Sequence, residues 1–326
     1  MKKITIESLI SEVTLLVNQK RYESALEVYV SIYKKYPDFL QPSQQALLTK
    51  ARKTHIQNAA NLARRSLFEQ TYSLGCTARL KEAIAMFCGG KPKQFTNENQ
   101  KPNFFYIPDL PSSPFLNVNE VEGLNEWITA ISKHKQSLLQ LCANAQENYV
   151  DTVGGVPDTV DWNILRAKWK SLHLKKAGEW TIESESLPES TKSLLNNDFI
   201  AHCPPHAPEV VISVLQPQTK IPLHFGISNI KWTLHIPLEV TSEASLYVSG
   251  ITRHWEAETT SLLFDDSFVH GAANNADVAR SVLIIDIWNP ALSQPERADI
   301  QTLMRIHSDW TSNYGVLARI DSRFYL

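Results

Sequence analysis

The stretch that decides the fold reads LLFDDSFVHGAANNADVARSVLIIDIWNP and covers residues 262–290. Two apolar runs, each short enough to be a buried strand, flank a polar patch that contains Asp265, Asp266 and His270. Arg280 follows ten residues after the histidine. Burying such groups without partners costs several kcal/mol each, and a sheet core does not need them. The pattern therefore predicts that these side chains bind something.

Short apolar runs with a period near two begin at about residue 165 and predict strands. They cover 167–174, 209–215, 231–240, 244–250, 260–266 and 280–288. Gly, Pro, Asn and Asp separate them at intervals of roughly eight to twelve residues. Many short strands without helices between them favour a double-sheet antiparallel fold such as a jelly roll. A helix over 294–315 is expected to follow.

The N-terminal part of the chain, residues 1–90, has helical periodicity throughout. Its segment 21–39 carries apolar residues on one face up to Pro37, like the second helix of a tetratricopeptide repeat. We see no second copy at the repeat spacing, so a plain helical bundle remains an alternative. Residues 91–103 are rich in Gly, Pro and Asn and predict a linker. The jelly-roll domain is then expected over 104–326.

The composition is that of a soluble globular protein, with 43% hydrophobic and 20% charged residues in a chain of 326. A formal net charge of -2 provides no basic field for nucleic acid or an anionic membrane. No apolar run approaches the roughly 20 residues of a membrane span. Cys76, Cys88, Cys142 and Cys203 form no CxxC pair, which favours reduced thiols in a cytoplasmic protein. The oligomeric state is not predicted.

Several polar residues interrupt the predicted strands, at positions that a jelly roll can bring to one open end. They are Ser213, His224, His235, His270 and Arg280. Two histidines can hold a metal through their imidazole nitrogens, and an arginine can hold a carboxylate in a bidentate fork. A single histidine in a β protein is more often structural than a ligand. Arg280 can equally face solvent, and the two aspartates can cap a turn by accepting backbone N–H groups.

The order of these residues resembles that of the aspartyl/asparaginyl β-hydroxylases, a family of Fe(II)/2-oxoglutarate oxygenases. The resemblance covers residues from about 103 to 300 and rests on SVLQPQTKIPLHFGISNIKWTLHIPLEV (213–240), RHWEAETTSLLFDDSFVHGAANN (253–275) and RSVLIIDIWNP (280–290). In a turn where the family has glycine, this chain has Glu258. The resemblance implies an α+β protein, with a double-stranded β-helix (jelly-roll, cupin-like) catalytic domain after the helical-repeat-like domain.

The resemblance also implies a role for each candidate residue. His224 and His270 would be the two iron ligands, Arg280 and Ser213 would hold the distal carboxylate of 2-oxoglutarate, His235 would contact the carboxylate beside the keto group, and Trp169 would line the same pocket. Gly226 stands where most such oxygenases carry a third, carboxylate ligand, and this family lacks that carboxylate. For the neighbouring pair of aspartates, holding the turn is preferred over orienting a ligating imidazole.

The implied reaction consumes O2 and 2-oxoglutarate, releases succinate and CO2, and hydroxylates an unactivated C–H bond. The expected position is the β-carbon of an Asp- or Asn-type side chain in a peptide or protein, which the N-terminal helices would recruit. Relatives acting on proteins tend to carry arginines between Asn229 and His235, where this chain has Lys231, Trp232 and Thr233, and a threonine is common at Phe225. These differences leave the implied iron and 2-oxoglutarate residues unchanged and concern the substrate. A halogenase-like enzyme and a non-catalytic scaffold with a vestigial barrel remain alternatives.

Overall fold

The computed structural model describes residues 5–41, 49–149, 159–255 and 260–320, so the turn expected around Glu258 lies outside the described residues. Contacts divide the chain into two compact units. The first unit comprises residues 1–75, 84–93 and 302–326, and the second comprises residues 76–83 and 94–301. The sequence-based boundaries after residues 90 and 103 remain predictions.

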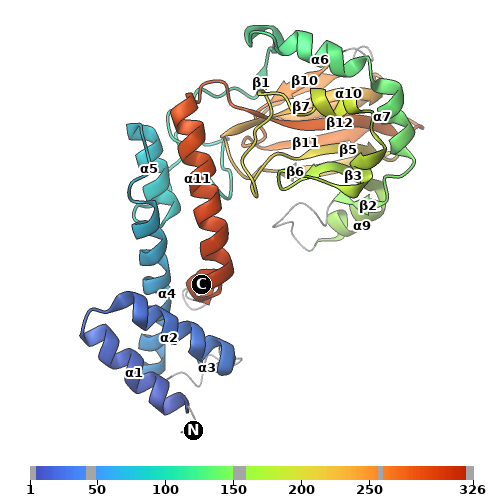
Figure 1. The fold of residues 1–326 in the computed structure, drawn as a ribbon. Helices are drawn as coiled ribbons and strands as arrows, with labels where there is room; N and C mark the ends of the chain where they lie inside the picture. Colours follow the sequence, from blue (N-terminus) through green and yellow to red (C-terminus); the bar gives the residue numbers. More distant parts are fainter. Residues whose placement is uncertain (1–4, 42–48, 150–158, 256–259, 321–326) are drawn as a thin grey trace. The chain divides into compact units, whose positions relative to one another are not determined.

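Helices build the first unit (Figure 1). They are α1 (Ile6–Asn18), α2 (Tyr22–Lys35), α3 (Pro37–Leu40), α4 (Lys50–Thr71), part of α5 (Ala78–Phe87), part of α11 (Gln294–Trp310), η4 (Thr311–Gly315) and α12 (Val316–Ile320). Helix α1 begins with a capping box, in which Thr5 and Ser8 each accept the backbone N–H of the other. Pro37 is the first residue of α3, where a missing N–H costs nothing. The expected helical N-terminal region is confirmed, and its tetratricopeptide-like character stays a prediction.

The second unit contains the strands and the remaining helices. The strands are β1 (Phe115–Leu116), β2 (Glu147–Asn148), β3 (Trp169–Lys176), β4 (Glu179–Trp180), β5 (Val210–Leu215), β6 (Thr219–His224), β7 (Lys231–Glu239), β8 (Ala244–Val248), β9 (Ile251–His254), β10 (Leu262–Phe264), β11 (His270–Asn274) and β12 (Arg280–Trp288). The helical segments are η2 (Val118–Glu120), α6 (Leu124–Ser132), α7 (Lys135–Cys142), α9 (Val160–Lys168), η3 (Ile182–Ser186) and α10 (Glu189–Leu194).

Within the described residues, these strands form two antiparallel sheets. The larger sheet has the order β1-β10-β7-β12-β5-β3-β2, with β4 paired to β3, and the smaller has the order β6-β11-β8-β9. From β5 to β12 the chain passes repeatedly from one sheet to the other, with β5, β7, β10 and β12 in the larger sheet and β6, β8, β9 and β11 in the smaller. This alternation is the double-stranded β-helix that the sequence predicted, and the chain is an α+β protein.

Strand β12 shows why the larger sheet has two different faces. Val282 and Ile284 belong to a core that also contains residues of the smaller sheet, whereas Leu283 and Ile285 belong to a second core with residues of α6 and α7. Neighbouring side chains of a strand point to opposite faces, so one face meets the smaller sheet and the other is covered by helices. Polar residues on the inner face, between the sheets, are therefore enclosed.

Helices α6 and α7 lie between β1 and β2 in sequence, and the C-terminal helix expected over 294–315 continues beyond residue 315 into α12. None of the helices within the described residues has the length and apolar character required to cross a membrane. The predicted cytoplasmic location stays a prediction.

Candidate active site

A cavity of about 240 Å³ lies on the inner face of the larger sheet, within the second unit. Its lining includes all six residues that the sequence singled out: Trp169, Ser213, His224, His235, His270 and Arg280. They come from six different strands, one residue from each: β3, β5, β6, β7, β11 and β12. The fold thus brings together side chains that are up to 111 residues apart in sequence, from 169 to 280.

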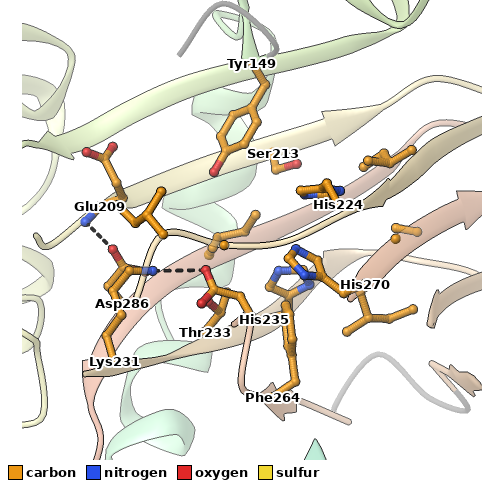
Figure 2. A pocket seen from close by; sticks show the side chains of 18 of the residues that line it. Tyr149, Glu209, Ser213, His224, Lys231, Thr233, His235, Phe264, His270 and Asp286 are labelled. Atoms are coloured by element: carbon orange, nitrogen blue, oxygen red, sulfur yellow. Dashed lines mark hydrogen bonds and ion pairs between the residues drawn. The ribbon is translucent and has the colours of Figure 1, made fainter. Parts of the chain in front are cut away.

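His224 and His270 are direct neighbours on adjacent strands. His224 ends β6, His270 begins β11, and the two residues are register partners in the smaller sheet. Their ring centroids are 4.1 Å apart. Cross-strand partners on one face have their Cβ atoms about 5 Å apart, which puts both imidazoles on one side of the sheet. Figure 2 shows the two rings side by side in the cavity.

A backbone carbonyl sets the tautomer of each of these rings. His224 Nδ1 lies 2.8 Å from Pro222 O, and His270 Nδ1 lies 2.9 Å from Phe268 O. A carbonyl oxygen only accepts, so each Nδ1 carries the proton and each Nε2 carries a lone pair. Burial lowers the pKa of His224 to about 3 and of His270 to about 4, so both rings are neutral near pH 7. Neutral imidazoles with an open Nε2 are what a metal ion requires.

Arg280 is a buried cation with few partners. Its side chain is 2% exposed, and within the described residues neither Nε nor Nη1 has a hydrogen-bond partner. The guanidinium lies 5.2 Å from the centre of the Trp255 ring, in cation–π range. Burial lowers the pKa of Arg280 to about 10, which still leaves it charged near pH 7. An unpartnered buried guanidinium is costly, so its presence favours an anionic ligand.

Ser213 and Trp169 are held to each other beside this arginine. Trp169 Nε1 donates to Ser213 Oγ over 2.9 Å, and both side chains are buried. In the ladder β3-β5-β12, Trp169 and Arg280 are both register partners of Leu215. Because Ser213 Oγ accepts the Trp169 N–H, the hydroxyl hydrogen of Ser213 is available to donate to another acceptor.

His235 lies on β7 between aromatic rings. It stacks on Trp255 with an interplanar angle of 5° and meets Phe264 edge-on, at centroid distances of 6.3 and 5.1 Å. Burial, then the charge of Arg280, lowers its pKa well below the usual value, so the ring is neutral. In the described part of the chain, its Nδ1 has no hydrogen-bond partner. The ring therefore retains hydrogen-bonding capacity for a ligand.

Asp266 fills the space next to Gly226. A Cβ atom built at residue 226 would lie 2.4–2.6 Å from the carboxyl atoms of Asp266, and Gly226 N–H donates to Asp266 O over 2.7 Å. The Asp266 carboxylate thus lies beside residue 226, the position that carries the third, carboxylate ligand in most such oxygenases. It comes from the segment before β11 and not from the segment after β6. The expectation that both aspartates only hold a turn is wrong for Asp266. Asp265 does hold the turn, since it accepts Ser267 N–H and the Ser267 hydroxyl, and it also accepts a hydrogen bond from Gln100 Nε2 over 3.1 Å.

Lys231 joins this aspartate to a second one, Asp286, which Figure 2 shows beside the lysine. Its Nζ lies 3.2 Å from Asp266 Oδ2 and 2.7 Å from Asp286 Oδ1. Asp286 Oδ2 also accepts the backbone N–H of Glu209 over 2.9 Å. The two carboxylates raise the pKa of Lys231 against the opposing effect of burial. We call Lys231, Asp266 and Asp286 the buried ion triad.

The sequence missed the triad and Trp255. Lys231, Thr233 and His235 alternate along β7, so their shared face could have been recognised from the period of two. Asp286 shares its face with Arg280 on β12 by the same rule. No sequence signal indicated that Asp266 turns toward Gly226. Among the described residues, no three or more His, Cys, Asp or Glu side chains gather closely enough to hold a metal ion by themselves.

Residues 125–290 match the model of the aspartyl/asparaginyl beta-hydroxylase family. This match covers half of the chain. The chain belongs to the aspartyl/asparaginyl β-hydroxylase family. It is 29% identical to aspartate beta-hydroxylase domain-containing protein 2 of Homo sapiens over 213 residues, which cover 61% of this chain and 53% of that protein. It is 30% identical to aspartyl/asparaginyl beta-hydroxylase of Mus musculus over 96 residues, or 29% of this chain and 13% of that protein.

The chain spans little more than half the length of the domain-containing relatives that it matches. Among solved structures, a 2OG-Fe(II) oxygenase family oxidoreductase from Burkholderia pseudomallei aligns with 45% of this chain and 79% of its own, at 12% identity and a TM-score of 0.27. Membership of this family favours hydroxylase chemistry as the basis for a functional proposal.

Proposed function

We propose that this chain is an Fe(II)- and 2-oxoglutarate-dependent dioxygenase that hydroxylates an unactivated C–H bond of a peptide or protein side chain. The observation that carries the proposal is the pairing of two neutral histidines with a buried arginine whose Nε and Nη1 have no hydrogen-bond partner among the described residues, all in one cavity. An iron ion held by His224 and His270 would supply the activation of O2. The rest of the site consists of groups that bind and orient.

The donor atoms fit both groups. Each ligating histidine has its Nδ1 proton on a carbonyl, which fixes the ring and leaves Nε2 open. Arg280 offers Nε and Nη1 to the distal carboxylate of 2-oxoglutarate, and the Ser213 hydroxyl, oriented by Trp169, offers a further donor. His235 would contact the carboxylate next to the keto group. These roles follow the family resemblance, and the geometry supports them.

Asp266 favours hydroxylation over halogenation. Its carboxylate occupies the space beside Gly226, where a bound halide would need a favourable electrostatic environment. A halide beside Gly226 and the Asp266 carboxylate would repel each other, whereas a water molecule there can donate a hydrogen bond to the carboxylate. The halogenase alternative is therefore the weaker one. A vestigial barrel would have no reason to keep this buried arginine.

The test is an anaerobic titration of the whole chain with Fe(II) and 2-oxoglutarate, followed by turnover under 18O2 with and without chloride. We expect a charge-transfer absorption band on titration, succinate on turnover, and one 18O atom in the product. A chlorinated product would promote the halogenase. If neither the charge-transfer band nor succinate formation is observed, the chain is a non-catalytic scaffold and the dioxygenase proposal is wrong.

We further propose that the N-terminal helices recruit the peptide or protein substrate. Leu15 on α1 is 56% exposed and Tyr72 at the end of α4 is 78% exposed, so a partner can reach both side chains. Replacing both by serine is expected to weaken substrate affinity while uncoupled 2-oxoglutarate turnover stays unchanged. Equal substrate affinity in the variant and the parent would remove this role.

A further inference from the structure

Charged groups that are already paired lie across the cavity from the histidines, and one member of this set, Asp266, extends to Gly226, two residues from His224. Figure 2 shows Glu209, Lys231 and Asp286 on one side of the cavity, and His224, His235 and His270 on the other. If iron and 2-oxoglutarate occupy the histidine side, the other side is left for the substrate. This inference therefore rests on the proposed dioxygenase function.

Lys231 is the centre of the buried ion triad. It contacts both aspartates, and its side chain is only 6% exposed. Asp286 is held further by the N–H of Glu209, and its own backbone N–H donates to Glu209 O. The lysine is therefore fixed between two carboxyl groups, so the triad has one basic and two acidic side chains. Burial raises the pKa of Asp286, and the charge of Lys231 opposes that rise.

The other basic side chains on the lining also have partners. Lys176 Nζ lies 3.6 Å from Glu147 Oε2. His173 has Nδ1 at 3.1 Å from Glu147 Oε2 and Nε2 at 3.2 Å from Glu209 Oε2, so a carboxylate faces each ring nitrogen. Arg280 lies with Trp255 and His235, on the side proposed for 2-oxoglutarate. Within the described residues, an incoming carboxylate would meet no uncommitted cation beside the triad.

On the side of the triad, three lining atoms have no hydrogen-bond partner within the described residues: Asp266 Oδ1, Thr233 Oγ1 and Glu209 Oε2, the last of which lies 3.2 Å from His173 Nε2. A carboxylate oxygen only accepts hydrogen bonds, and a buried acceptor without a donor is costly. A donor supplied by a ligand would satisfy Asp266 Oδ1, and the acidic side chains of the triad would attract a positive charge on that donor.

We propose that the triad side of the cavity selects a substrate that presents a positively charged hydrogen-bond donor, an ammonium or a guanidinium group, and disfavours a carboxylate. The specificity-determining residues are Asp266 and Asp286, with Lys231 holding them in place. An amide donor satisfies the hydrogen bond without the charge, so it ranks between the cation and the carboxylate.

The experiment measures binding and turnover with matched probes. The whole chain, loaded with Fe(II) and 2-oxoglutarate, is titrated without O2 by calorimetry with the Nα-acetyl amides of arginine, lysine, asparagine and aspartate. Butylguanidine is added as a guanidinium cation without peptide groups, to separate recognition of the cationic group from recognition of the peptide groups. Succinate formation in air is then measured with each probe and with none.

We expect the cationic probes to bind about tenfold more tightly than the aspartate probe, and to raise succinate formation above the rate without probe. Asp286→Asn should reduce the cation-over-carboxylate preference to about threefold or less. Asp266→Asn provides a second variant in case the first does not fold. Asp277→Asn, an exposed aspartate outside the cavity, is the matched control and should keep the full preference.

Equal or tighter binding of the aspartate probe, no binding of any cationic probe, or an unchanged preference in both folded triad variants would overturn the inference. The two proposals fail differently. If the chain forms no succinate and does not bind 2-oxoglutarate, the dioxygenase proposal fails, and the probe affinities of the chain alone still report whether the triad prefers cations.

Discussion

His224 and His270 are register partners on adjacent antiparallel strands, with their ring centroids 4.1 Å apart. The pairing fixes their separation through the backbone ladder, not through a flexible loop. The metal site that we propose is thus built into the smaller sheet, and the predictions below begin there.

Replacing His224 or His270 by alanine should abolish metal-dependent succinate formation, because each is expected to supply one of two protein ligands. The fold should survive, since one ring is partly exposed and both lie at strand ends. Metal content and succinate are the measurements. His254→Ala on β9 is the control, because His254 is an exposed histidine of the same sheet. Full activity in both variants would contradict the assignment.

Arg280→Gln should weaken 2-oxoglutarate binding by about tenfold to a hundredfold, since charge-assisted hydrogen bonds contribute roughly 1.5–3 kcal/mol. Iron binding should hardly change. The apo-protein should not lose stability, and Arg280→Met should raise its melting temperature, because two guanidinium nitrogens lack partners in the described residues. Calorimetric 2-oxoglutarate titration and thermal melts provide the readouts. Unchanged cosubstrate affinity would mean that the anion binds elsewhere.

Gly226→Ala should destabilise the protein by about 1–3 kcal/mol, because the new methyl group would displace a carboxylate that Lys231 holds. Chemical denaturation measures the change. Gly90→Ala is the matched control, since its Cβ would meet nothing closer than 3.4 Å. If the two variants lose equal stability, Asp266 moves aside freely and does not occupy a fixed position.

The stability of the apo-protein should fall as the pH falls from about 6.5 toward 4. His224 and His270 have folded-state pKa values of about 3 and about 4, below the usual 6.5. Between these values the unfolded chain binds protons that the folded chain does not, so acid favours unfolding. The variant His224→Asn/His270→Asn should flatten this slope in denaturation curves taken at several pH values. A slope identical to that of the parent would show that other groups cause it.

Glu296→Gln should cost about 2–3 kcal/mol at pH 7. Glu296 is 1% exposed, accepts two hydrogen bonds from Arg79, and has its pKa lowered to about 2, chiefly by that arginine. This stabilisation is complete above pH 4.5 and is lost as the pH falls through about 2. Denaturation at pH 7 measures the loss. Glu69→Gln, in an exposed pair with Arg65, should have almost no effect.

The sequence by itself determined the fold class and six of the candidate site residues, because both are encoded locally. Short apolar runs predict strands such as β7 and β12, and a polar residue inside such a run is easily recognised as a candidate site residue. The segments 213–240, 253–275 and 280–290, which carry His224, His235, His270 and Arg280 in order, indicated the family through motifs such as FDDSFVH and DIWNP.

Only the tertiary structure decided what these residues contact. Strands β6 and β11, which carry both proposed iron ligands, were not predicted as strands, because each is short and only partly apolar. Asp266 and Asp286 meet Lys231 from different segments, so no spacing reveals the triad. Trp255 lies under Arg280 for the same reason. Pairing between strands distant in the chain depends on register and sheet order, which a linear pattern of residues does not specify.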